Sequence, residues 1–131
     1  IIESDVDVCE LPTIWNNLYK EYLGIDVPSD KEGILQDVHW AGGSFGYFPT
    51  YALGSAYGAQ MLDAMKKDLD FEKEINKPNL KAINEWLKEH IHIYGATKNP
   101  DELMNIATGM SFDASYYVEY LKNKFSKLYN L

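Results

Sequence analysis

The sequence predicts an all-α protein, an irregular array of about five or six helices. Apolar residues recur at helical spacing along most of the chain, and prolines and glycines stand where such helices would begin and end. No stretch of useful length alternates apolar and polar residues as a half-buried strand does. The 131 residues suffice for one domain, so we expect 1–131 to form a single helical segment.

The first helix is expected to begin at Pro12 and to end before Gly24, because proline suits the first helical turn and glycine suits the residue after the last. Its apolar face comprises Ile14, Trp15, Leu18, Tyr19, Tyr22 and Leu23. Residues 25–32 are expected to form a loop.

Residues 33–48 follow neither the helical nor the strand period. Glycine occupies four of these sixteen positions, which makes regular structure costly. The segment nevertheless carries several large aromatic and aliphatic side chains, so it does not resemble a solvated linker. Irregular backbone with such side chains is typical of functional sites.

A second long helix is expected from Pro49 to about Asp68. It is apolar nearly all round, which is typical of a buried helix. Gly54 and Gly58 share one face and predict close packing against another helix. If its packing partners belong to a missing part of the protein, this helix should expose apolar surface and favour self-association, for instance as a homodimer.

Three more helices are expected in the remainder. The first carries an apolar stripe over 80–91 and ends near Gly95. Asn99 should cap the next, which Gly109 ends, and Asp113 should cap the last. The inward residues of that last helix are expected to be Tyr117, Val118, Leu121, Phe125 and Leu128.

The composition argues against several classes of function. Acidic residues number 20 against 12 basic ones, and the net charge of −8 is unsuited to nucleic acid. No apolar run approaches the length of a membrane span, and the first residues do not resemble a signal peptide. The single Cys9 fits a reducing, cytoplasmic location. Because the sequence lacks an initiator methionine, we expect it to be a piece of a longer protein.

The residues that most often bind metals are poorly placed in this sequence. His90 and His92 are two apart on an expected helix and should point to different faces, with His90 half-buried and His92 on the surface. Cys9 is far from every histidine and is expected to be a structural thiol. We therefore expect this chain by itself to bind no metal.

One cluster of polar and aromatic residues remains as a candidate site. Its members are Gln36, Asp37, His39, Trp40, Tyr47 and Tyr51. Within sixteen positions they offer amide, carboxylate, imidazole, indole and phenol groups. From the residues alone, two interpretations stay open: a polar network that satisfies irregular backbone, or a wall that faces a ligand.

The same stretch resembles a known family. Gly33-Ile34-Leu35-Gln36-Asp37-Val38-His39-Trp40 matches the G-x-x-Q-D-x-H-W motif of the carboxypeptidase Taq family, the thermostable metallocarboxypeptidases. The string Phe45-Gly46-Tyr47-Phe48-Pro49-Thr50-Tyr51-Ala52-Leu53-Gly54 is also similar to that family. Segments within 11–24, 85–92 and 100–109 extend the resemblance over essentially the whole chain.

This resemblance implies a zinc- or cobalt-dependent exopeptidase that removes single residues from the C-termini of peptides. The family's H-E-x-x-H metal centre and its arginine-bearing motif are absent from this sequence. The chain therefore looks like the C-terminal part of a larger, zincin-like helical metallopeptidase. Its partners would be the peptide substrate and the N-terminal remainder of the enzyme, which would hold the zinc or cobalt.

The resemblance also implies roles for individual residues. His39 would donate a hydrogen bond to the substrate backbone or to the developing oxyanion, and Tyr47 would be a second oxyanion donor. Gln36 and Asp37 would orient His39 and its loop. Trp40 and Tyr51 would pack beside them or contact the substrate.

Three hypotheses follow. The chain is part of a metallocarboxypeptidase and is inactive alone, or it is a non-catalytic helical interaction module that has kept the sequence without the chemistry. The third is a small enzyme of another class that uses His39 with Asp37. We favour it least, because residues two apart do not easily pair on regular structure.

Overall fold

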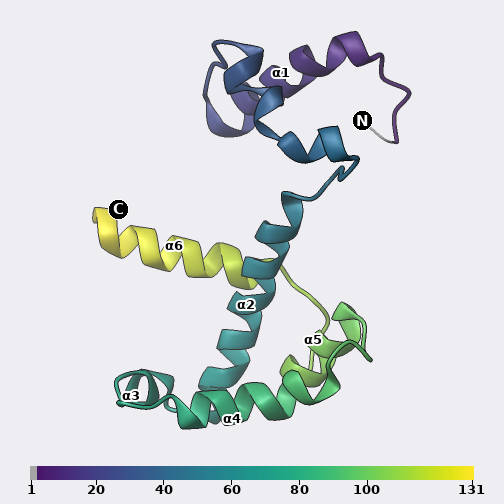
Figure 1. Ribbon diagram of the computed structural model, residues 1–131. Coiled ribbons are helices and arrows are strands. Elements are labelled where there is room, and N and C mark those ends of the chain that lie inside the picture. The colour runs from purple at the N-terminus through teal and green to yellow at the C-terminus, as the bar shows by residue number, and fades with distance from the viewer. Residues whose placement is uncertain (1–2) are drawn as a thin grey trace. The chain divides into compact units, whose positions relative to one another are not determined.

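The computed structural model describes residues 3–131, which are helical and contain no strand. Two compact units follow each other along the chain, Ile1–Phe48 and Pro49–Leu131 (Figure 1). The prediction of an all-α protein is therefore confirmed. The prediction of one helical segment over 1–131 concerns how the two units combine and stays a prediction.

The first unit consists of one α-helix and four short 3₁₀-helices. They are η1 (Val8–Glu10), α1 (Leu11–Leu23), η2 (Asp30–Glu32), η3 (Ile34–Gln36) and η4 (Val38–Gly42). As predicted, α1 has Pro12 in its first turn and ends at Gly24, where φ is 70°. The Gly24 amide donates to the carbonyl of Lys20, which satisfies one of the free carbonyls at the end of the helix.

Gly33 allows the motif segment to pack closely against α1 and the loop that follows it. A Cβ atom added at Gly33 would lie 2.6 Å from Val27 Cγ1 and 3.3 Å from Asn16 Oδ1. Only a residue without a side chain fits so near to these atoms. The next residue, Ile34, is buried beside this contact and begins η3.

The second unit contains five α-helices and one 3₁₀-helix. They are α2 (Pro49–Asp68), α3 (Phe71–Ile75), α4 (Lys81–His90), η5 (His92–Tyr94), α5 (Pro100–Thr108) and α6 (Ser115–Tyr129). Figure 1 shows α2 as the longest of them, and both α5 and α6 pack against it. The bounds of α2 agree with the prediction, whereas the short helix α3 was not predicted.

The core of this unit lies between α2, α4 and α5. Its buried members are Ala64, Met65, Ile83, Trp86 and Ala107. The indole of Trp86 donates to Asp68 Oδ2 over 2.7 Å, so its one polar group is satisfied at the edge of the core. The apolar stripe predicted for 80–91 is therefore the face of α4 that enters the core.

Gln60 connects α2 to the turn between α5 and α6. Its side chain is 1% exposed, and its Nε2 donates to the Ser111 carbonyl over 3.0 Å and to Thr108 Oγ1 over 3.3 Å. Its Oε1 accepts from the Asp113 amide over 2.9 Å. Nearly all the hydrogen-bonding capacity of this buried amide is used, so Gln60 fixes the approach to α6.

The helix α2 exposes apolar side chains, as expected for a buried type of helix whose packing partners are missing. Only Ala56, Gln60, Ala64 and Met65 of the helix are buried, while Tyr51 and Leu53 near its start are exposed. A Cβ added at Gly54 or Gly58 meets no atom within 4 Å in the described residues, so no close helix contact forms there within this chain.

The predicted cap of α5 is found, whereas the N-cap residue of α6 is Ala114 and not the predicted Asp113. Asn99 and Glu102 form a reciprocal capping box at the start of α5, which ends at Gly109. The amide of Ser115 donates to Asp113 Oδ1 over 2.8 Å at the start of α6. This hydrogen bond lowers the pKa of Asp113 below its ordinary value of 3.8.

We expect Gly33→Ala to destabilise the protein by about 1–3 kcal/mol, because the new methyl group overlaps Val27. Thermal unfolding measures the effect. Gly42→Ala is the matched control in the same loop, since a Cβ at Gly42 meets nothing within 4 Å. Equal unfolding temperatures for the two variants would contradict the close packing at Gly33.

We expect the stabilising effect of Glu102 to depend on pH. Hydrogen bonding from the Asn99 amide, then from Lys98, lowers the pKa of Glu102 below 4.5. A lowered pKa in the folded state means that Glu102 stabilises the fold above pH 4.5 and loses this effect as the pH falls through the folded pKa.

Glu102→Gln should therefore be less stable than the parent protein at neutral pH, and the difference should shrink in acid. Thermal unfolding over a series of pH values measures it. Glu89→Gln, an exposed position on α4, controls for the general loss of one negative charge. A difference that stays constant down to the most acidic sample would contradict the prediction.

Candidate functional site

His39 and Asp37 form a hydrogen-bonded pair in the first unit. Asp37 Oδ1 accepts from the backbone amide of His39 over 3.1 Å and lies 2.9 Å from His39 Nδ1. Asp37 is 8% exposed. It stands at the N-cap of η4 with φ −84° and ψ 86°, a non-helical conformation that turns its side chain back over the first turn.

The sequence argument that residues two apart do not pair is wrong at this position. That argument assumes a regular backbone, in which such residues face different sides. Asp37 lies outside the helix that contains His39, so one carboxylate oxygen reaches both the backbone amide and the imidazole ring.

This pairing decides which proton the imidazole can offer. An ionised carboxylate only accepts hydrogen bonds, so the Nδ1 of His39 that faces it carries a hydrogen and donates a hydrogen bond to Asp37. The other nitrogen, Nε2, accepts a hydrogen bond when the ring is neutral and donates one when the ring is protonated.

Two aromatic rings enclose the imidazole of His39. The ring of Tyr47 lies 4.5 Å away and that of Phe48 lies 4.7 Å away, the latter edge-on. The chain reaches them through a turn at Gly46, whose φ of 74° suits glycine. The side chain of His39 remains 30% exposed, so the ring is held in place and still accessible.

Trp40 packs against α1. Its ring lies 6.1 Å from that of Trp15 and 5.7 Å from that of Phe45. Trp15 in turn stacks on Tyr19. These aromatic contacts attach η4 to the helix that precedes it.

The other two predicted site residues are Gln36 and Tyr51. The amide of Gln36 donates to the carbonyl of Lys31, which closes the loop before the motif. Tyr51 lies in the first turn of α2 and belongs to the second unit. Of the six candidates, the structure therefore brings Asp37, His39 and Tyr47 together.

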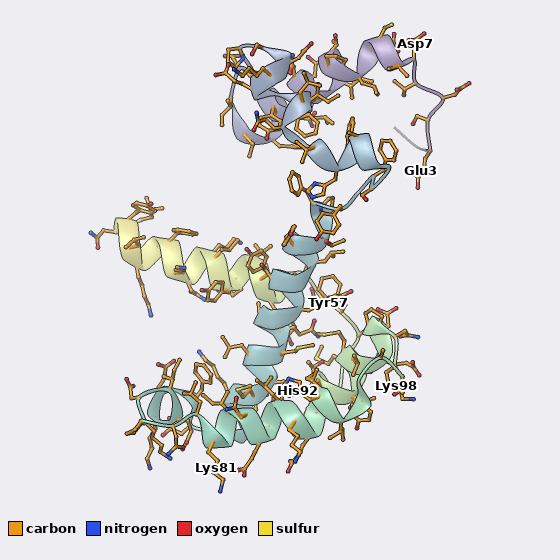
Figure 2. The ribbon with its side chains drawn as sticks, viewed as in Figure 1. Glu3, Asp7, Tyr57, Lys81, His92 and Lys98 are labelled. Carbon is orange, nitrogen blue, oxygen red and sulfur yellow. The ribbon has the colours of Figure 1, made fainter. Side chains whose placement is uncertain are left out.

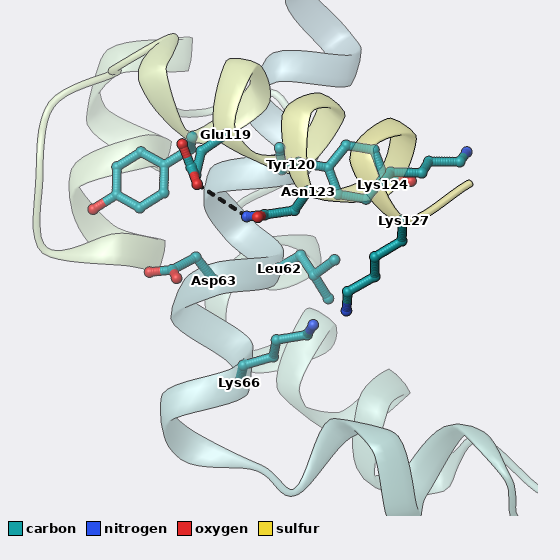
Figure 3. A pocket seen from close by; sticks show the side chains of 10 residues that line it. Leu62, Asp63, Lys66, Glu119, Tyr120, Asn123, Lys124 and Lys127 are labelled. Carbon is teal, nitrogen blue, oxygen red and sulfur yellow. Dashed lines mark hydrogen bonds between the residues drawn. The ribbon is translucent and has the colours of Figure 1, made fainter. Parts of the chain in front are cut away.

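The second unit has a cavity of about 350 Å³ between α2 and α6 (Figure 3). Three lysines line it, namely Lys66, Lys124 and Lys127, and Asn123 donates to Glu119 on its wall. None of the six candidate residues lies there. No sequence pattern indicates this cavity, because its residues come from two helices 50 or more positions apart in the chain.

The described residues 3–131 hold no group of three histidine, cysteine or acidic side chains that could bind a metal ion. His90 is half-buried and stacks on Trp86, and His92 is exposed beside the end of α4 (Figure 2), as predicted for both. Cys9 is exposed and so does not pack as a structural thiol.

None of the helices in residues 3–131 combines the length and the apolar character that a membrane crossing requires.

Comparison with known sequences identifies relatives of this chain. The family model of the carboxypeptidase Taq (M32) metallopeptidases matches residues 1–125. Carboxypeptidase 1 of Bacillus subtilis (strain 168) is 47% identical over 132 residues, which span 100% of this chain and 26% of that protein. Thermostable carboxypeptidase 1 of Pyrococcus furiosus is 41% identical over 95% of this chain and 25% of its own length.

Solved structures agree with the sequence comparison. The metallocarboxypeptidase 1 structure from Trypanosoma cruzi superposes with a TM-score of 0.85 at 38% identity, over 93% of this chain and 25% of that one. The M32 carboxypeptidase from Deinococcus radiodurans R1 gives a TM-score of 0.84 at 33% identity, over 96% and 26%. This chain thus spans about a quarter of the relatives that it matches. Together with the motif at 33–40, these matches establish that the chain belongs to the carboxypeptidase Taq (M32) metallopeptidase family.

Proposed function

We propose that this chain is the C-terminal portion of a metal-dependent carboxypeptidase that hydrolyses the last peptide bond of peptides. The observation that carries the proposal is the Asp37–His39 pair, set within the family motif of a chain that is 47% identical to a carboxypeptidase. Its proposed partners are the peptide substrate and the N-terminal remainder of the enzyme, and we expect it in the cytoplasm. A homodimer is compatible with its exposed apolar residues.

The metal centre is proposed to lie in the remainder of the enzyme. The side chains of residues 3–131 do not fit a metal ion, since no three candidate ligands converge. In the complete enzyme a divalent ion, zinc or cobalt, would polarise the scissile carbonyl. The contribution of this chain is then one wall of the substrate cleft.

His39 is the proposed donor to the substrate. With Nδ1 bonded to Asp37, Nε2 is the ring nitrogen proposed to donate to the substrate backbone or to the oxyanion that forms during hydrolysis. The Asp37 carboxylate and the rings of Tyr47 and Phe48 hold the imidazole before charge develops. Such fixed donors stabilise the transition state more than the ground state.

Tyr47 is the proposed second donor. Its ring lies beside that of His39, and the residue is 42% exposed. A phenol hydroxyl at this place would share the charge of the oxyanion.

The remaining candidates are proposed to support these two. Gln36 closes the loop before the motif through Lys31, and Trp40 anchors η4 on α1. Tyr51, in the first turn of α2, is proposed to bind substrate or to support His39 and Tyr47.

We expect His39→Ala in the full-length enzyme to lower kcat by about 10²–10³ with little change in KM, as the loss of an oxyanion donor does. Asp37→Asn should also lower kcat, because an amide oxygen accepts a weaker hydrogen bond than a carboxylate and so holds the imidazole less firmly. Steady-state hydrolysis of a blocked dipeptide measures both. His92→Ala is the control, since His92 is exposed outside the motif. Unchanged kcat in His39→Ala would contradict the role of His39.

We expect the isolated chain to be inactive with added zinc or cobalt, whereas the full-length enzyme loses activity to a chelator and regains it with the metal. Release of the C-terminal residue from a blocked dipeptide measures both. Metal-dependent hydrolysis by the isolated chain would refute the proposal that the metal centre lies elsewhere. A full-length protein without hydrolytic activity would favour a non-catalytic interaction module.

A further inference from the structure

Charged side chains gather around the cavity between α2 and α6 in the second unit. Its volume of about 350 Å³ lies within the range of about 300–1,000 Å³ that is typical of small-ligand pockets. Lys66 of α2 and both Lys124 and Lys127 of α6 line it, together with the acidic residues Asp63 and Glu119. The cavity thus has the size and the charged groups that an ionic ligand requires.

The side chains of Lys66 and Lys127 reach this cavity from different helices. Figure 3 shows their ammonium groups pointing toward one another, with Asp63 and Glu119 on the other side of the cavity. Within residues 3–131, Lys66 forms an ion pair with the exposed Glu72 over 3.5 Å, and Lys127 forms none. Like charges that face each other repel, and an anion between them replaces this repulsion by attraction.

The acidic side chains of the cavity have other partners. Asp63 Oδ2 lies 2.7 Å from Lys67 Nζ, and Glu119 Oε1 accepts from Asn123 Nδ2 over 3.0 Å. The hydrogen bond to Asp63 raises the pKa of Lys67 above its ordinary value of 10.5, so Asp63 is engaged by a lysine that does not line the cavity. In the described part of the chain neither acid pairs with Lys127, and the basic side of the cavity keeps its charge.

The charge of α6 is opposite in sign to that of the whole chain. The helix carries Lys122, Lys124 and Lys127 against one acid, Glu119, so its net charge is +2, whereas that of the chain is −8. An anion is therefore attracted to α6 in an otherwise acidic chain.

Aromatic rings hold two of these lysines in place. Lys66 Nζ lies 5.6 Å from the centre of the Phe71 ring. Lys124 Nζ lies 5.7 Å from the centre of the Tyr120 ring and 5.8 Å from that of Phe125. A cation over an aromatic face is attracted to it. Ordering these long side chains before a ligand arrives reduces the entropy that binding costs.

We propose that this cavity binds a small phosphate-bearing anion, with one phosphoryl group between Lys66 and Lys127. A phosphoryl group carries up to two negative charges and several acceptor oxygens, so it can bond ammonium groups from two helices at once. A carboxylate carries one charge and is matched better by arginine, which this sequence lacks. The phosphoryl group belongs either to a free oligophosphate or to a nucleotide. This inference does not rest on the proposed function.

Lysine acetylation of the full-length enzyme tests the proposal. Trace labelling with acetic anhydride, read by mass spectrometry, gives the reaction rate of each lysine with and without pyrophosphate. We expect pyrophosphate to slow the labelling of Lys66 and Lys127 by about tenfold, because a charge-assisted hydrogen bond keeps the amine protonated. Lys122, on α6 but outside the cavity, should react at an unchanged rate. Ionic strength is held constant, since salt screens such interactions.

Lys127→Gln should remove the protection of Lys66, because the proposed anion needs both ammonium groups. Lys122→Gln is the matched control, since it removes the same charge from the same helix and should leave the protection of Lys66 intact. Lys127→Arg keeps the charge and should also keep the protection. Thermal unfolding checks that the three variants are folded. The rates are measured at the lysines themselves, so pyrophosphate bound to a metal ion elsewhere in the enzyme does not affect them.

Two further ligands define the chemistry of the site. Adenosine diphosphate that protects at lower concentration than pyrophosphate would assign the phosphoryl group to a nucleotide, and equal protection would assign it to a free oligophosphate. Succinate that protects as well as pyrophosphate would refute the assignment to phosphate. Unchanged rates at Lys66 and Lys127, or an equal slowing at Lys122, would overturn the site itself.

Discussion

The arrangement of the motif depends on the Asp37 carboxylate. Its Oδ1 accepts a hydrogen bond from the backbone amide of His39, and this bond caps the start of η4. The same oxygen contacts the imidazole and so fixes the orientation of the ring. Hydrogen bonds to a charged group contribute about 1.5–3 kcal/mol each, more than neutral ones. The same buried group thus sets the local backbone and the orientation of His39. It also supplies a polar group to the groove that Leu11, Leu35 and Val38 line.

The two units differ in how their elements are held together. In the second unit α2, α4 and α5 share an apolar core, and Gln60 fixes the turn before α6. The first unit buries Gly33, Ile34 and Asp37 and exposes many apolar residues, such as Leu35 and Val38. A segment of its size rarely buries enough surface to be stable alone. The exposure of these apolar residues is consistent with a chain that spans about a quarter of the length of its relatives. The relatives contain further structure that is available to cover the corresponding surface.

Local signals explain why the helices were predicted well and part of the site was not. Proline and glycine restrict φ wherever they stand, so Pro12, Gly24 and Pro49 mark helix ends independently of the rest of the fold. The apolar sequence of α2 does not show which of its packing partners the chain contains, so the extent of its burial had to come from the structure. No local pattern indicates the role of Gln60, because its polar partners lie about 50 positions away in the chain.

The sequence by itself determined the helical class, most helix ends and the family, because periodicity, capping residues and the motif at 33–40 are local properties. Only the tertiary structure decided that Asp37 pairs with His39, that Gln36 turns to Lys31 and that Val8 and Leu11 meet Leu35 and Val38 in one groove. These contacts depend on irregular φ and ψ angles and on segments brought together by folding, neither of which a residue pattern specifies.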